Sequence, residues 1–167
     1  MPEIHARSFR TACELLPTRG SSWSVVSIGG PGGSTPPGFD PQNPRHLRLE
    51  FDDVSHEGLH TRGWRVPQPE DVEKLVQASD ALYEGDVILC HCAAGVSRST
   101  AAAYILRCLK SGPGNESEDL EAVVRDRPVA SPNLLMVRYA DWQLGRDGRM
   151  IRAVDRIADL KGRLGIE

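Results

Sequence analysis

The chain of 167 residues is long enough for one domain with a buried core, and 40% hydrophobic with 26% charged residues is an ordinary globular composition. A formal net charge of −3 argues against a general nucleic-acid binder, which usually carries a basic excess. No apolar run approaches the roughly 20 residues that span a bilayer. We therefore expect one domain over residues 1–167, with no nucleic-acid partner and no membrane span.

The cysteines indicate a reducing environment. Cys13, Cys90, Cys92 and Cys108 are too few for a disulfide scaffold in a chain of this length. The first ten residues, MPEIHARSFR, carry charges every few positions and lack the apolar stretch of a secretory signal. We therefore expect free thiols and a cytoplasmic location.

The predicted elements begin with a strand over 23–28, WSVVSI, which stops at two glycines. A loop rich in Gly and Pro follows, up to Pro44. A half-buried strand is predicted over 46–51, because apolar residues alternate there with polar ones. Pro69 opens a helix that ends at Gly85.

The run 86–91, DVILCH, is apolar without alternation, which is typical of a buried central strand. After a short loop, helices are predicted over 97–110, 117–127, 133–144 and 150–164. The alternation of strands and helices favours an α/β fold with a largely parallel sheet.

The segment DVILCHCAAGVSRSTAAAYIL places a tight loop between the buried strand and a helix. Ligands of open α/β sheets bind at the carboxyl ends of the strands, where this loop lies. The small residues Ala93, Ala94 and Gly95 allow backbone N–H groups to converge on one anion, and the helix N-terminus adds its own donors. Arg98 can add a bidentate fork to two phosphate oxygens. The loop therefore predicts a phosphate cradle.

Cys92 stands at the mouth of this cradle. The field that binds a phosphate dianion also stabilises a thiolate, which is the nucleophilic form of cysteine. Attack on phosphorus would give a covalent cysteinyl-phosphate. Ser99 could donate its hydroxyl to the sulfur, and His91 could orient the loop through hydrogen bonds.

HCAAGVSRST resembles the active-site loop of protein tyrosine and dual-specificity phosphatases, in which His-Cys is followed by five residues, Arg, and Ser or Thr. A weaker resemblance extends from about Ile4 to about Leu144 and includes LRLEFDD and RPVASPN. It implies the cysteine-phosphatase fold, with a mostly parallel sheet of four to five strands. It also implies that Cys92 and Arg98 are catalytic and that the phosphate is held by Ala93, Ala94, Gly95, Val96, Ser97 and Arg98.

Expelling an alkoxide or phenolate requires a proton donor opposite the thiol. Asp52 and Asp53 end the strand over 46–51, and side chains alternate along a strand, so only one of them should face the cradle. The resemblance places the general acid at Asp53. Asp52 and His56 remain as alternatives.

A phosphorylated protein or peptide is the expected substrate. Phosphoinositide comes second, because the variable loop positions carry no extra Lys, and RNA 5′-phosphate comes third. A silent phosphate-binding module is the rival from another class, although both Cys92 and Arg98 are present. A sulfurtransferase or arsenate reductase fits the HC and Ser99 context less well.

No metal or cofactor is expected. The reaction needs none, and Cys90, His91 and Cys92 are too closely spaced to surround a zinc ion. In a strand, Cys90 and Cys92 would point to the same side, so a sulfur–sulfur link under oxidation is an alternative to a plain buried role for Cys90.

Overall fold

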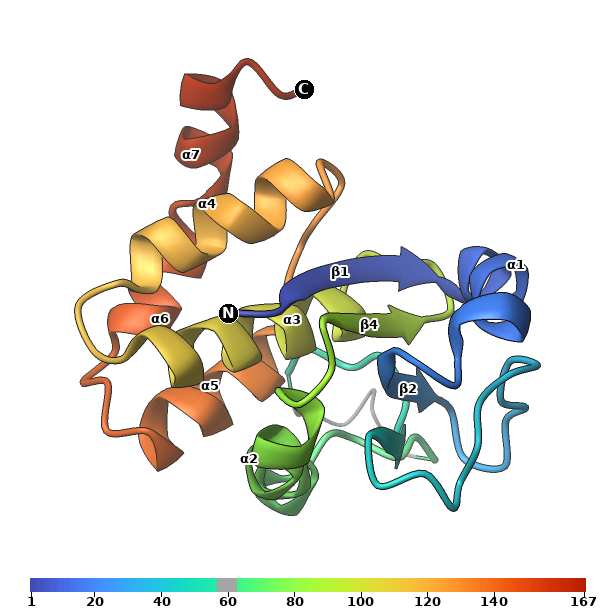
Figure 1. Cartoon of the computed structure of the whole chain (residues 1–167). Coiled ribbons are helices and arrows are strands. Elements are labelled where there is room, and N and C mark those ends of the chain that lie inside the picture. Colours follow the sequence, from blue (N-terminus) through green and yellow to red (C-terminus); the bar gives the residue numbers. More distant parts are fainter. Residues whose placement is uncertain (57–62) are drawn as a thin grey trace.

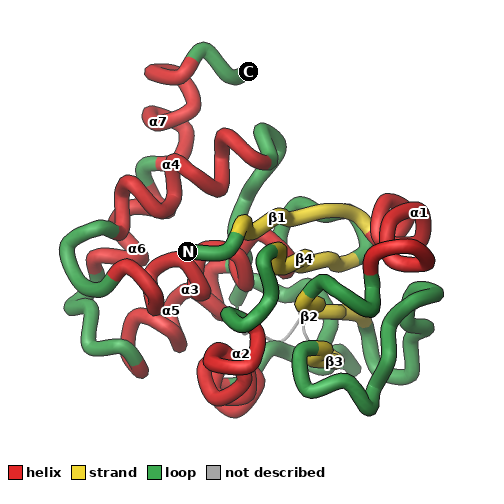
Figure 2. The backbone as a smooth tube through the Cα atoms, in the orientation of Figure 1, coloured by secondary structure: helices red, strands yellow, loops and turns green. Residues whose placement is uncertain are grey.

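A computed structural model describes residues 1–56 and 63–167 and contains a four-stranded parallel sheet (Figure 1). The strands are β1 (Glu3–Ser8), β2 (Ser24–Gly29), β3 (His46–Glu50) and β4 (Val87–Cys92). Figure 2 shows them side by side in the order β1-β4-β2-β3, and every neighbouring pair is parallel. The predicted α/β fold with a mostly parallel sheet is confirmed.

Strand β1 and helix α1 (Phe9–Arg19) were not predicted. In β1 only Ile4 and Ala6 are buried hydrophobic residues, so its apolar pattern is weak. The strand is held by its pairing with β4 and by Asp126, whose carboxylate accepts a hydrogen bond from the Ala6 N–H at 2.9 Å. Ser8 then caps α1 by accepting a hydrogen bond from the Thr11 N–H at 3.2 Å.

The two faces of the sheet carry different helices. On one face α1 packs Ala12 and Leu16 against Val25 and Leu89. The remaining helices lie on the other side of the sheet, where some contact the strands and the rest pack on other helices. The core on this side includes Val26, Ile28, Ile88 and Cys90. These helices are α2 (Pro69–Leu82), α3 (Arg98–Ser111), α4 (Glu116–Asp126), α5 (Leu134–Gln143) and α6 (Arg149–Asp155), followed by α7 (Ile157–Leu164). None of the described helices is long and apolar enough to cross a membrane.

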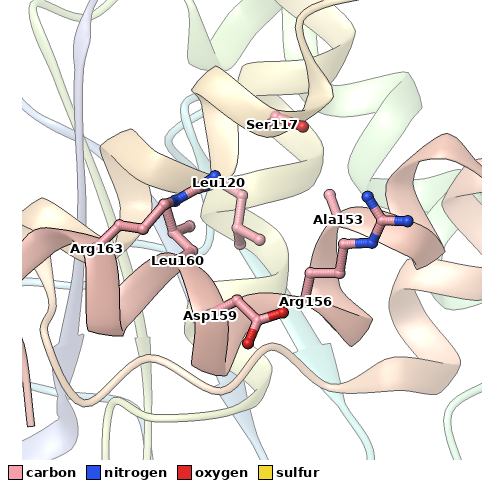
Figure 3. Close-up of a pocket in the computed structure, with 7 residues that line it drawn as sticks. All are labelled: Ser117, Leu120, Ala153, Arg156, Asp159, Leu160 and Arg163. Atoms are coloured by element: carbon pink, nitrogen blue, oxygen red, sulfur yellow. The ribbon is translucent and has the colours of Figure 1, made fainter.

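The single helix predicted over 150–164 is wrong, because the chain breaks between α6 and α7 at Arg156. Arg156 has φ −100° and ψ 15°, outside the helical region. The break brings Leu160 into the core cluster that contains Leu120 of α4 (Figure 3). Burial of Leu160, which is 6% exposed, compensates for the lost helical hydrogen bonds.

Candidate active site

Cys92 is the last residue of β4, and the loop 93–97 joins it to α3. Its thiol is buried, with 2% of the residue exposed, and its Sγ lies 3.2 Å from the hydroxyl oxygen of Ser99. The predicted strand, loop and helix are therefore present. The thiol and the hydroxyl expected to assist it are in contact.

The backbone of loop 93–97 turns its carbonyl groups away from the enclosed space. All five carbonyls accept hydrogen bonds from other segments. Among the described residues, no hydrogen bond uses the N–H of any of these five, which leaves five donors for an anion. The acceptors are Ala93, Ala94, Gly95, Val96 and Ser97, and their donors are, in the same order, Phe9 N at 3.1 Å, Arg127 Nη2 at 3.1 Å, Arg127 Nε at 2.8 Å, Ser131 N at 2.9 Å and Asn133 N at 3.1 Å.

Gly95 is required by this geometry. Its φ is +68°, in the left-handed region that favours glycine. A Cβ at this position would also lie 2.4 Å from the carbonyl carbon of Arg7 and 2.4 Å from the nitrogen of Ser8. Any other residue would push the loop away from the end of β1.

Arg98 is positioned by the strand end that carries the two aspartates. Its Nη1 donates a hydrogen bond to the Phe51 carbonyl at 2.7 Å, and the residue is only 7% exposed. Its Nε is buried and has no hydrogen-bond partner among the described residues. A buried, unpaired guanidinium N–H is costly, so it indicates a site for an oxyanion.

The two aspartates point to different neighbours. Asp53 Oδ1 accepts hydrogen bonds from the Ser97 hydroxyl at 2.7 Å and from Asn133 Nδ2 at 3.0 Å. Asp52 Oδ2 instead accepts the Arg65 N–H at 2.8 Å. Asp53 therefore lies against loop 93–97, whereas Asp52 binds the backbone of Arg65. His56, the third candidate, is exposed in the segment that follows.

His91 lies at the base of the site and is 1% exposed. Arg48 Nη1 donates to the Ser27 hydroxyl oxygen at 2.8 Å, and that oxygen lies 2.7 Å from His91 Nε2. The Ser27 oxygen thus lies between the Arg48 guanidinium and the His91 ring and links the two side chains. Burial lowers the pKa of His91 to about 4, and the charges of Arg48 and Arg98 lower it further in the same direction.

Arg127 and Asn133 begin and end the segment RPVASPN, and the sequence does not predict their contacts. Arg127 donates hydrogen bonds to the carbonyls of Ala94 and Gly95 in loop 93–97. Asn133 is fully buried, caps α5 by accepting the Met136 N–H at 3.1 Å, and donates to Asp53 from the same side chain. The Pro-Asn pair before a helix was the available signal, because Asn is a preferred helix cap.

Asp126 fixes the end of α4 beside Arg127. Its two oxygens accept from Arg7 Nη1 at 2.8 Å and Nη2 at 3.0 Å, and Oδ1 lies 2.6 Å from His5 Nδ1. Burial alone would raise the pKa of Asp126, but the hydrogen bonds from His5 and Arg7 lower it to about 2. The backbone next to Arg127 is therefore held against β1, and Gly95 packs against the end of the same strand.

Cys90 is 0% exposed in the core, and desolvation by burial raises the pKa of its thiol. A buried thiol held in its neutral form is a poor nucleophile. All four cysteines are free thiols.

No family model and no curated protein matches this chain. Solved structures do. The chain is similar to human DUSP28, with 20% identity, a TM-score of 0.60, and coverage of 87% of this chain and 93% of that one. It is similar to DUSP15, with 21% identity, a TM-score of 0.61 and coverage of 93% and 92%. It is also similar to PTPMT1 in complex with PI(5)P, with 17% identity, a TM-score of 0.57 and coverage of 87% and 94%. The chain thus has the dual-specificity phosphatase fold implied by its loop.

Arg127→Ala should weaken binding of vanadate by about tenfold or more, because two loop carbonyls lose a charged donor and the N–H ring loses its alignment. The dissociation constant can be measured by calorimetry. Arg125→Ala is the control, since Arg125 lies two residues before Arg127, in α4, and pairs with Glu121 at the surface, where its side chain is 62% exposed. Equal affinity in the Arg127→Ala and Arg125→Ala proteins would contradict a role in shaping the loop.

The contribution of His91 to the free energy of unfolding should decrease as the pH falls. The unfolded chain binds the histidine proton near pH 6.5 and the folded chain only near pH 4, so its contribution falls as the pH falls through that window. His91→Asn should therefore lose less free energy of unfolding than the original protein between pH 7 and pH 4.5. Urea unfolding at both pH values measures this difference, and identical losses would mean that His91 does not titrate as described.

Proposed function

We propose that this protein is a cysteine-dependent phosphomonoester hydrolase that acts first on phosphotyrosine in proteins or peptides, with phosphoserine and phosphothreonine as further substrates. The observation that carries the proposal is the loop 93–97 beside Cys92. Its five carbonyls all accept hydrogen bonds, whereas its five N–H groups donate none to the part of the chain that the structure describes. Such a ring of donors fits a tetrahedral oxyanion.

In the first step the Cys92 thiolate attacks phosphorus in line with the leaving oxygen. The P–S bond forms while the bond from phosphorus to the leaving oxygen breaks. The loop N–H groups and the free part of the Arg98 fork hold the three remaining phosphate oxygens. Asp53 gives its proton to the leaving oxygen, which departs as a phenol or alcohol.

In the second step the ionised Asp53 accepts a proton from water, whose oxygen attacks phosphorus as the P–S bond breaks. The Ser99 hydroxyl, 3.2 Å from the sulfur, donates to the departing thiolate. Inorganic phosphate leaves, and Asp53 again carries its proton.

The contacts of Asp53 also assign its two oxygens. Oδ1 accepts from Ser97 and from Asn133, whereas no contact to a described residue engages Oδ2. We assign the transferred proton to Oδ2. Asn133 thereby holds the carboxyl group in one orientation, which reduces the entropy lost on reaching the transition state.

Two exposed apolar side chains favour an aromatic substrate. One lies in a segment that binds loop 93–97, and the other lies next to a residue that binds Asp52. Val129, 52% exposed, lies between Arg127 and Ser131, both of which bind the phosphate loop. Trp64, 59% exposed, precedes Arg65, whose N–H binds Asp52. Apolar surface of this kind suits a phenyl ring more than a sugar phosphate. The likeness to PTPMT1 bound to PI(5)P makes a phosphoinositide the second candidate.

Cys92→Ser should lower kcat/KM for para-nitrophenyl phosphate by more than about a thousandfold, because the alcohol is a far weaker nucleophile. The variant should still bind vanadate, which the loop holds through its backbone. Cys13→Ser, a change in α1, should keep full activity. Retained turnover in a folded Cys92→Ser protein would exclude the mechanism. Parallel assays on phosphotyrosine peptide and on PI(5)P decide between the substrate classes.

Asp53→Asn should lower kcat for phosphotyrosine peptide by about a hundredfold or more and lower it much less for para-nitrophenyl phosphate, whose phenol needs little protonation. Asp52→Asn should change either rate only modestly. The two variants are to be assayed on both substrates across pH. If Asp52→Asn alone shows the leaving-group dependence, the acid is Asp52. If neither variant shows this dependence, His56 is the next residue to test as the acid.

A further inference from the structure

A groove of about 880 Å³ lies between α2 and the end of α5, on elements that carry none of the proposed catalytic side chains. Its α2 wall includes Glu70, Glu73 and Val76, which share one face of that helix because they recur every three residues. Its α5 wall ends with Trp142. We refer to this feature as the α2–α5 groove.

Trp142 is 76% exposed, the largest value among the exposed large hydrophobic side chains of the described residues. An indole ring in water loses the burial that normally stabilises it, and tryptophan is enriched at the centres of protein interfaces. Its position in a groove provides a flat apolar surface on which a partner can stack.

The charge of the groove is negative. Glu70 and Glu73 line it, and its lining contains no Lys or Arg among the residues that the structure describes. Neither carboxylate forms an ion pair with a described residue, and Glu73 accepts only a hydrogen bond from Gln77 at 3.3 Å. Two uncompensated carboxylates beside an indole ring are complementary to a cation with an apolar stem.

The walls are already fixed in place. Gln143 Nε2 donates a hydrogen bond to the Pro69 carbonyl at 2.8 Å, which ties the end of α5 to the start of α2. A groove that is formed before binding loses little conformational entropy when it is filled.

We propose that the α2–α5 groove binds a basic segment of a polypeptide, with an Arg or Lys stacked on Trp142 and its charge shared by Glu70 and Glu73. As a docking site for the phosphoprotein substrate, this assignment rests on the proposed function. Phosphate-rich partners such as lipid headgroups and RNA are disfavoured, because the carboxylates repel them.

The fold also sets the spacing between this segment and the phosphate loop. Helix α5 starts beside Asn133 at the site, and Trp142 lies nine residues further along, about 13.5 Å away at 1.5 Å per residue. An extended chain covers about 3.3 Å per residue. A substrate that uses both positions therefore needs at least about four residues from its phosphotyrosine to its basic segment.

The first test is binding of an unphosphorylated peptide that carries four arginines, measured by calorimetry on the full chain. The paired substitution Glu70→Gln and Glu73→Gln should weaken this binding about tenfold, and Trp142→Ala should weaken it similarly. The matched control is Glu14→Gln with Glu118→Gln, which removes two exposed carboxylates from α1 and α4 and should leave affinity unchanged. Equal losses in the control pair and the groove pair, or no loss in either, would overturn the proposal.

The second test uses phosphotyrosine peptides with the basic segment placed two or seven residues from the phosphotyrosine. The groove variants should raise KM for the longer spacing only, with kcat/KM for para-nitrophenyl phosphate unchanged. If no peptide is hydrolysed but the first test succeeds, the proposed function fails and the binding site stands. Vesicles containing PI(5)P that bind through Trp142 would make the groove a lipid surface and overturn the assignment.

Discussion

The outward orientation of five consecutive carbonyls in loop 93–97 is the constraint on which the site depends. Five aligned N–H dipoles on the inner side repel one another, so the loop would not hold this shape by itself. Contacts from the start of α1, the end of α4 and the segment before α5 maintain it. Because these contacts do not involve the anion, the donors are in place before an anion arrives.

The same segments fix the distance between Asp53, the proposed acid, and Cys92, the proposed nucleophile. Asn133 binds the phosphate loop through its backbone N–H at 3.1 Å and Asp53 through its side chain at 3.0 Å. Arg98 in turn binds the carbonyl of Phe51, two residues before Asp53, at 2.7 Å. The strand end that carries the acid is thus held at two points. Small shifts of a reacting group cost large factors in rate, so this double attachment matters to catalysis more than to stability.

The local part of the site could be predicted from the sequence, and the long-range part could not. Cys92, Gly95 and Arg98 follow one another within a strand, a tight turn and a helix start, and each residue type has a local physical reason to be there. Arg127 gives no such signal, because an Arg beside a proline reads as an ordinary surface residue until the fold brings Gly95 to it.

Strand β1 could not be predicted from the sequence for a related reason. Its polar residues His5 and Arg7 are compensated by Asp126, which is about 120 positions later in the chain, and no window of sequence contains both partners. The break at Arg156 depends on tertiary packing in the same way, since only the position of α4 makes the burial of Leu160 favourable. Strand alternation indicates that only one of Asp52 and Asp53 faces the cradle, and the resemblance favours Asp53. The partners that distinguish them, Ser97 and Arg65, are visible only in three dimensions.

The similar structures share 17% to 21% of their residues with this chain, and the physics of the fold explains how little sequence it needs. A core accepts many apolar combinations of similar volume, so most buried positions are free to differ. Loop 93–97 accepts few residue combinations, because each position there must meet a specific geometric requirement. Exposed positions such as Trp142 and Glu73 serve neither core packing nor loop geometry, since the fold gains little buried area from Trp142 and no ion pair to a described residue from Glu73. An exposed indole ring adds apolar surface that favours association, so it is best explained by what binds to it. The two proposals therefore assign the chemistry and the choice of partner to different parts of the molecule, the first to the loop after β4 and the second to the outer faces of α2 and α5.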